Sequence, residues 1–152
     1  MRRLPFIFLT ILVVGCGGLS SKQRSAADES VKALRKIAAA TEVGVNYQTY
    51  GQLLIDAKAK VNEAKDVLLD GDLKTEMNAA MDSYGDAATV WGTKIQNQGY
   101  FYEIGETKPI TDKYKLQEIA KNNLLIDGDI VIKIIWAEAR THLEKADTLL
   151  KK

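Results

Sequence analysis

The sequence predicts an all-α fold, an antiparallel up-down-up bundle of three helices with a long first helix. Apolar residues recur at alternating steps of three and four positions through most of the chain, which is the spacing of one helix face. Residues that favour helices are abundant, and the two prolines are Pro5 and Pro109. Helices with one apolar face bury it against one another, so segments joined by short turns form a bundle.

The first predicted helix covers residues 28–69, because Asp28, Glu29 and Ser30 suit a helix start and an apolar stripe follows them. Gly44 and Gly51 lie on that stripe. Glycine weakens a helix, so two on the seam predict that another helix backbone approaches closely there. The alternative is a break of the helix near these glycines. The stripe consists of Ala33, Ile37, Ala40, Gly44, Tyr47, Gly51, Leu54, Lys58, Val61, Ala64 and Leu68.

Two Asp-Gly-Asp triplets mark predicted helix boundaries in the rest of the chain. The first, at residues 70–72, predicts a tight turn with Gly71 left-handed and Asp72 capping a second helix that runs to about Gln96. Residues 96–110 have no helical period and predict a loop. A further helix is expected from Thr111 through Leu124. The second triplet, at residues 127–129, predicts a break before the closing helix, which would give four helices.

The N-terminus has the three parts of a secretory signal. Met1-Arg2-Arg3 is positively charged, residues 4–14 carry no charge, and small Gly15 precedes Cys16, the only cysteine. The apolar run is about half the ~20 residues that a membrane-spanning helix needs. Two interpretations stay open at this point: a lipoprotein signal, or an ordinary secretory signal with an incidental cysteine.

Val13-Val14-Gly15-Cys16 resembles the lipobox of bacterial lipoproteins. The resemblance implies a thioether-linked diacylglycerol on Cys16, cleavage after Gly15, and a further acyl chain on the freed amine. Residues 1–15 would then be the cleaved signal, residues 16–27 the lipidated cysteine with a flexible tether, and residues 28–152 the bundle domain. By the same resemblance, Gly17 after the cysteine favours the outer membrane, or the cell surface in a bacterium with a single membrane.

The charge of the chain argues against nucleic acid as a partner. The full sequence holds 21 basic and 20 acidic residues, and removal of Arg2 and Arg3 leaves 19 against 20, a net charge of −1. Nucleic-acid affinity depends on neutralising phosphates, which a near-neutral chain does poorly. Electrostatic docking on anionic lipid is not indicated either. If Cys16 is lipidated, no thiol is left for a disulfide, a redox couple or a thiolate metal site.

The sequence offers little that indicates catalysis. Glu138 and His142 stand four residues apart on one helix face, but a zinc site needs a third protein ligand and no second histidine exists. We therefore expect both on the solvated surface. Neither Asp-Gly-Asp triplet continues as an EF-hand loop, so helix capping explains both. We expect no enzyme activity, no metal and no cofactor.

The aromatic residues divide into two groups. Tyr47, Tyr84, Trp91 and Trp136 fall on helical seams and are expected in the core. Tyr100-Phe101-Tyr102 stands in the loop, where it either caps the end of the bundle or contacts a partner, since aromatic side chains are enriched in binding hot spots.

The sequence therefore predicts a membrane-anchored bacterial envelope lipoprotein, a non-catalytic helical module that interacts with another envelope protein or has a structural role. The alternative is a small-ligand-binding or transport-accessory lipoprotein. It would have a pocket between helices, bordered by Ala40, Gly44 and Gly51.

Overall fold

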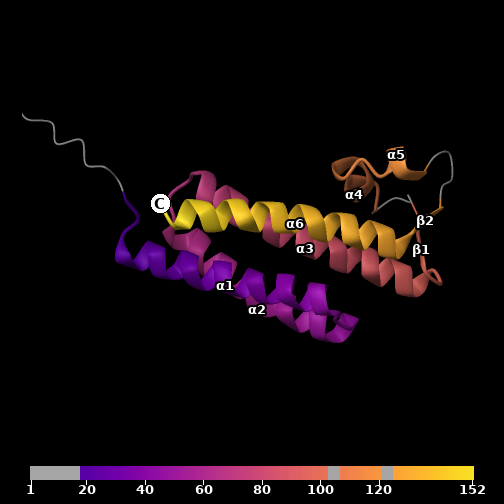
Figure 1. Ribbon diagram of the computed structural model, residues 1–152, viewed down its shortest axis with the longest axis horizontal. Helices are drawn as coiled ribbons and strands as arrows, with labels where there is room; N and C mark the ends of the chain where they lie inside the picture. Colours follow the sequence, from indigo (N-terminus) through magenta and orange to yellow (C-terminus); the bar gives the residue numbers. More distant parts are fainter. Residues whose placement is uncertain (1–17, 103–106, 121–124) are drawn as a thin grey trace, which may run out of the picture.

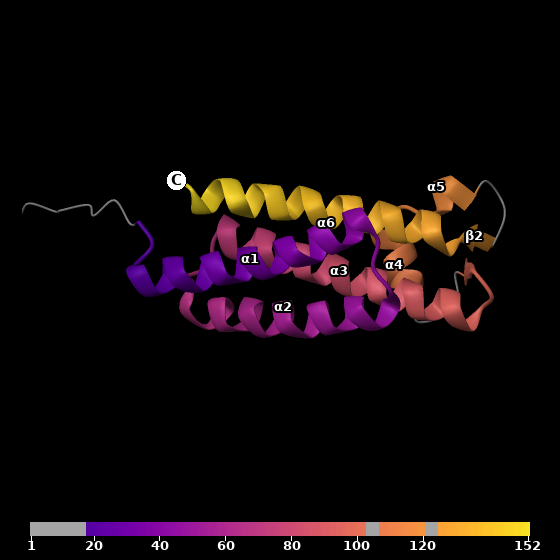
Figure 2. The same ribbon diagram turned by 60° about the horizontal axis from the view of Figure 1, so that its bottom comes forward.

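The computed structural model describes residues 18–102, 107–120 and 125–152. The part of the chain it describes contains four long helices, which confirms the all-α prediction. They are α1 (Ser21–Val43), α2 (Tyr47–Val67), α3 (Asp72–Gln96) and α6 (Gly128–Leu150). Each runs antiparallel to the one before it (Figure 1). α1 packs on α2 and α6, and α3 packs on the same two helices, so the four surround one core (Figure 2).

The predicted continuous first helix is wrong, because the chain reverses between residues 43 and 47. α1 ends at Val43, and Gly44 takes a φ of 95°, in a region that side chains rarely adopt. Asn46 then caps α2, its side chain accepting a hydrogen bond from the Thr49 amide at 2.8 Å. Gly51 lies inside α2, where an added Cβ would meet no atom within 4 Å. Neither Gly44 nor Gly51 therefore mediates a close helix–helix approach.

α1 begins earlier than predicted, at Ser21. Ser20 and Gln23 form a capping box: the Gln23 amide donates to the Ser20 hydroxyl at 3.3 Å, and the Ser20 amide donates to the Gln23 side chain at 2.9 Å. Ala27 is buried in the core. Residues 21–27, predicted as part of a flexible tether, are therefore the first two turns of the bundle.

The turn between α2 and α3 falls where the first Asp-Gly-Asp triplet predicts it, but the residues have other roles. α2 ends at Val67, and Gly71 is the N-cap of α3 with an extended φ of 165°, so it is not left-handed. Asp72 stands in the first turn of α3. Lys74 holds the turn together, its ammonium donating to the Leu68 carbonyl at 3.2 Å and to Asp70 at 3.0 Å.

The connection from α3 to α6 contains short elements in place of the predicted loop and helix. They are β1 (Tyr100–Tyr102), α4 (Lys108–Lys113), α5 (Gln117–Ala120) and β2 (Leu125–Asp127). The strands pair antiparallel, with Phe101 opposite Ile126. The helix predicted from Thr111 through Leu124 is wrong, because α4 ends at Lys113; Leu124 lies outside the described residues.

The second Asp-Gly-Asp triplet starts α6 and does not break a helix. The Asp127 carboxylate accepts a hydrogen bond from the Asp129 amide at 2.7 Å. Gly128 is where a close backbone approach does occur: its amide donates to the Gly99 carbonyl at 3.1 Å, and an added Cβ would meet the Lys94 side chain at 2.8 Å. The predicted capping role of this triplet is confirmed.

An aromatic cluster, defined as Tyr47, Tyr50, Trp91 and Trp136, packs at the edge of the core, where Trp91 and Trp136 are half-buried. The ring centre of Trp91 lies 5.6–5.8 Å from those of the other three. Tyr50 is fully buried; its hydroxyl donates to the Tyr84 carbonyl at 2.8 Å and accepts from the Trp136 indole at 3.0 Å. The cluster therefore ties α2 to α3 and α6. Tyr47, expected in the core, lies at its rim and is 42% exposed.

Candidate functional site

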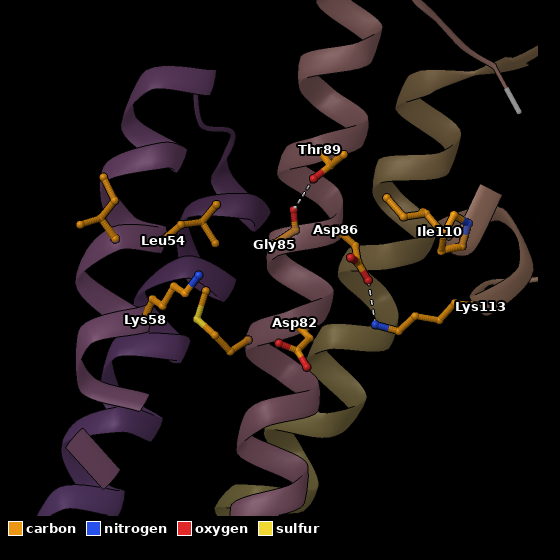
Figure 3. Close-up of a pocket in the computed structure, with 11 residues that line it drawn as sticks. Leu54, Lys58, Asp82, Gly85, Asp86, Thr89, Ile110 and Lys113 are labelled. Atoms are coloured by element: carbon orange, nitrogen blue, oxygen red, sulfur yellow. Dashed lines mark hydrogen bonds and ion pairs between the residues drawn. The ribbon is translucent and has the colours of Figure 1, made fainter. Parts of the chain in front are cut away.

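A groove of about 580 Å³ opens between α2, α3 and α4 (Figure 3). α2 and α3 supply two walls, and α4 supplies a third because the chain folds back over α3 after β1. The groove is lined by Leu54, Ile55, Lys58, Met81, Asp82, Gly85, Asp86, Thr89, Pro109, Ile110 and Lys113.

Asp86 fastens α4 to α3. Its carboxylate accepts hydrogen bonds from the Lys113 ammonium at 2.7 Å and from the Tyr114 hydroxyl at 2.8 Å. The ammonium also lies 5.0 Å from the centre of the Tyr114 ring, within the range of a cation–π contact. The third wall of the groove is thus held by one charged cluster.

The surroundings of this cluster shift the pKa values of Tyr114 and Lys113. Burial raises the pKa of Tyr114 to about 12, and the nearby Asp86 carboxylate adds to the shift. Burial, the largest single cause, would lower the pKa of Lys113, but the hydrogen bonds and charges of Asp86 and Tyr114 together outweigh it, and the Lys113 pKa is raised. Both groups therefore keep their protons, and the cluster keeps its hydrogen bonds, throughout the neutral range.

The groove combines an apolar interior with two charges that have no partner in the part of the chain that the structure describes. Met81 and Ile110 are buried along it, while Ile55 at its rim is 65% exposed. Lys58 on α2 and Asp82 on α3 face it from opposite walls, and neither forms a hydrogen bond or ion pair with a described residue (Figure 3). Gly85 leaves room, since an added Cβ there would meet nothing within 4 Å. The arrangement suits an apolar molecule that carries a charged group.

The predicted lipidation site lies outside the described residues. This holds for the cleavage position Gly15 and for Cys16. Of the aromatic triplet, Tyr100 is 49% exposed and Phe101 is fully buried. The prediction that Phe101 contacts a partner is therefore wrong. Successive residues of a strand point to opposite faces, and the Phe101 side chain faces the core. Tyr102 pairs through its backbone with Leu125, and its side chain lies outside what the structure describes.

His142 joins two helices. Its Nδ1 lies 2.6 Å from Glu76 of α3 and its Nε2 lies 3.3 Å from Glu138 of α6. The predicted placement of Glu138 and His142 on one helix face is confirmed. The predicted solvated position is wrong for His142, which is half-buried because α3 packs over it. No group of three or more histidine, cysteine or acidic side chains is placed to hold a metal among the described residues.

Sequence reasoning missed the groove. The groove does not lie beside Ala40, Gly44 and Gly51, where the sequence placed a pocket, because none of the three lines it. The helical periodicity predicted most of the long helices, but it did not indicate which side of α3 the later short elements would cover. The available signal was Pro109, which lies in the first turn of α4, a position where proline is common.

Comparison with protein-family models, with curated protein sequences and with solved structures finds no match for this chain. None of the described helices has an apolar stretch long enough to cross a membrane.

Proposed function

We propose that the chain is a non-catalytic lipoprotein of the bacterial cell envelope. Lipid on Cys16 anchors it to a membrane, and the four-helix bundle contacts another envelope protein. The lipobox-like segment at residues 13–16 supports the anchor. Gly17 favours the outer membrane, or the cell surface where there is a single membrane.

The observation that carries this proposal is the place where the bundle starts. α1 begins at Ser21, five positions after Cys16, at the same end of the bundle as the last turn of α6 (Figure 1). β1 and β2 lie at the opposite end. α3 has 25 residues, which at ~1.5 Å per residue spans about 37 Å. A lipid on Cys16 would therefore hold the bundle by one end and leave exposed Tyr100 at the other end for a partner.

Fractionation of cells that express the full chain tests the anchor. The wild-type protein should stay in the membrane pellet after carbonate and high-salt washes, because two or three acyl chains give stable anchoring where one does not. Cys16→Ser should release it, while Ser25→Ala, a change on the exposed side of α1, should behave as wild type. A Cys16→Ser protein that stays in the membrane pellet after both washes would contradict the proposal.

A second candidate function is favoured by the groove. Its apolar interior and the unpaired Lys58 suit an apolar molecule with an anionic group, which a small-ligand-binding lipoprotein would bind.

Fluorescence of 8-anilinonaphthalene-1-sulfonate, an apolar sulfonate, tests this second function. The wild-type bundle should enhance its emission, and Gly85→Leu should abolish the enhancement by filling the groove. Ala137→Leu adds the same side chain at an exposed position of α6 outside the groove and should leave binding unchanged. Equal enhancement by the Gly85→Leu and wild-type proteins would rule the groove out as this probe's site.

A further inference from the structure

The end of the bundle nearest Cys16 is built from three segments. They are the start of α1 at residues 20–24, the α2–α3 turn at residues 68–71, and the end of α6 at residues 150–152. We call these residues the anchor end. Figures 1 and 2 both place them together, opposite the β1–β2 end.

Hydrogen bonds hold the start of α1 against its neighbours at the anchor end. The Gln23 side chain donates to the Val67 carbonyl of α2 at 3.0 Å, and the Arg24 guanidinium donates to the Leu150 carbonyl of α6 at 2.8 Å. The chain therefore leaves the bundle at a fixed place. The start of α1 cannot swing away from the bundle without breaking these bonds.

The remaining link to Cys16 is short. Ser20 is four residues beyond Cys16, and an extended chain spans at most ~3.6 Å per residue, so the two Cα atoms are at most about 14 Å apart. The headgroup layer of a bilayer is itself roughly 5–7 Å thick on each side. A diacylglyceryl group on Cys16 would thus bring the anchor end to the membrane surface or into the headgroups.

The anchor end exposes an apolar side chain. Leu69, in the α2–α3 turn, is 81% exposed, although its neighbour Leu68 is buried in the core. The adjacent Asp70 charge is offset by Lys74 at 3.0 Å. Further exposed cations are Lys22, Arg24 and Lys152, while Lys151 is offset by Asp147 at 2.6 Å. These three cations outnumber Asp72, the exposed aspartate next to the turn. The chain is near neutral as a whole, but the fold gathers cations at this end.

We propose that the anchor end is a second membrane contact, in which Leu69 enters the headgroup region of the bilayer and the surrounding cations face anionic lipid headgroups. The contact rests on the proposed lipidation of Cys16. One lipid anchor would leave the bundle free to tilt, whereas a lipid anchor together with Leu69 holds it upright, with Tyr100 facing away from the membrane.

Site-specific fluorescence on the mature lipidated protein tests this contact. A thioether-linked Cys16 does not react with maleimides, so Leu69→Cys provides the one reactive thiol for an environment-sensitive maleimide dye. The labelled protein is reconstituted in vesicles of phosphatidylethanolamine and phosphatidylglycerol, with and without spin-labelled lipid. Matched controls carry the dye at Ile95→Cys near the far end of α3 or at Ile55→Cys on the side of α2, both exposed positions.

We expect a blue shift and quenching by spin-labelled lipid at position 69, and no quenching by that lipid at positions 55 and 95. Water-like, unquenched emission at position 69, with the protein still on the vesicles, would overturn the contact. Quenching at position 55 but not at 69 would also overturn it, because the bundle would then lie on its side. A second dye on Cys16, seen by intact mass, would show an unlipidated thiol and contradict the proposed function itself.

Discussion

Tyr50 and Tyr84 are neighbouring buried tyrosines whose hydroxyls differ in hydrogen bonding. The Tyr50 hydroxyl bonds to α3 and α6, whereas the Tyr84 hydroxyl has no hydrogen-bond partner among the described residues. A buried polar group costs free energy unless it is bonded, and removing one partner of a buried pair leaves the other unsatisfied.

Phenylalanine at the two positions should therefore have different effects. Tyr50→Phe leaves the Trp136 indole N–H without its acceptor and should lower the free energy of unfolding by about 1–3 kcal/mol. Tyr84→Phe removes a hydroxyl that has no bond and should leave stability equal or higher. Urea unfolding followed by circular dichroism measures both. Equal losses in the two variants would contradict the assignment of these hydroxyls.

Alkaline pH should destabilise the bundle through its buried tyrosines. Burial raises the pKa of Tyr84 and of Tyr114 from 10.0 to about 12. The unfolded chain therefore loses these protons first, so their contribution is complete below pH 10 and is lost as pH rises from about 10 to about 12. Urea unfolding at a series of pH values across this window should show a falling free energy of unfolding. Tyr84→Phe should make the fall shallower; an unchanged slope would argue against a raised Tyr84 pKa.

At the scale of elements, periodicity predicted the helices well and the connections poorly. The seams of α3 and α6 are buried as the spacing indicated, with Met77, Ala80, Tyr84 and Ala139 in the core. The predicted stripe holds at Val61 and Ala64 of α2, which are buried, but it fails earlier in that helix, after the turn at residues 44–46. Ala57 is buried where the continuous stripe placed Lys58. A steady repeat does not reveal a short turn that replaces one helix by two.

The short elements between α3 and α6 could not be predicted from periodicity at all. They are too brief to show a period, and their positions depend on distant partners such as Asp86 and Gly99. The groove residues escaped prediction for the same reason, since α4 reaches α3 only through tertiary contacts.

Replacing each of the two glycines of the predicted stripe by alanine tests whether it lies in a turn or inside a helix. Gly44→Ala forces a side chain into a φ of 95° and should cost about 1–3 kcal/mol. Gly51→Ala fills open space inside α2 and should stabilise by about 0.5–1 kcal/mol. Thermal unfolding would show the melting temperature moving in opposite directions. A large loss for Gly51→Ala would restore the close-packing interpretation.

The β1–β2 pair should depend on Phe101 and not on Tyr100. Phe101→Ala empties a fully buried site and should cost about 3–5 kcal/mol. Tyr100→Ala removes a half-exposed ring from the same strand and should change stability little. Urea unfolding of both variants decides this. If Tyr100→Ala also unfolds the bundle, Tyr100 is a structural cap and is not free for a partner.

For the whole molecule, fewer residues separate Cys16, the proposed lipidation site, from the bundle than the sequence predicted. The predicted tether of residues 16–27 shrinks to a few residues, because the Ser20 capping box starts α1 early. If Cys16 is lipidated as proposed, a bundle linked so closely to it has little freedom to move away from a membrane. The orientation of the bundle, with Tyr100 at the far end, would then depend on Cys16 together with Leu69.

Intact mass spectrometry of the protein extracted from cell membranes in detergent tests the anchor most directly. The mature chain should comprise residues 16–152 and carry the added mass of a diacylglyceryl group, with or without one further acyl chain. Fragmentation should place that mass on Cys16. A mature chain that begins at another residue, or that carries Cys16 as a free thiol, would show that the protein is not a lipoprotein anchored through Cys16.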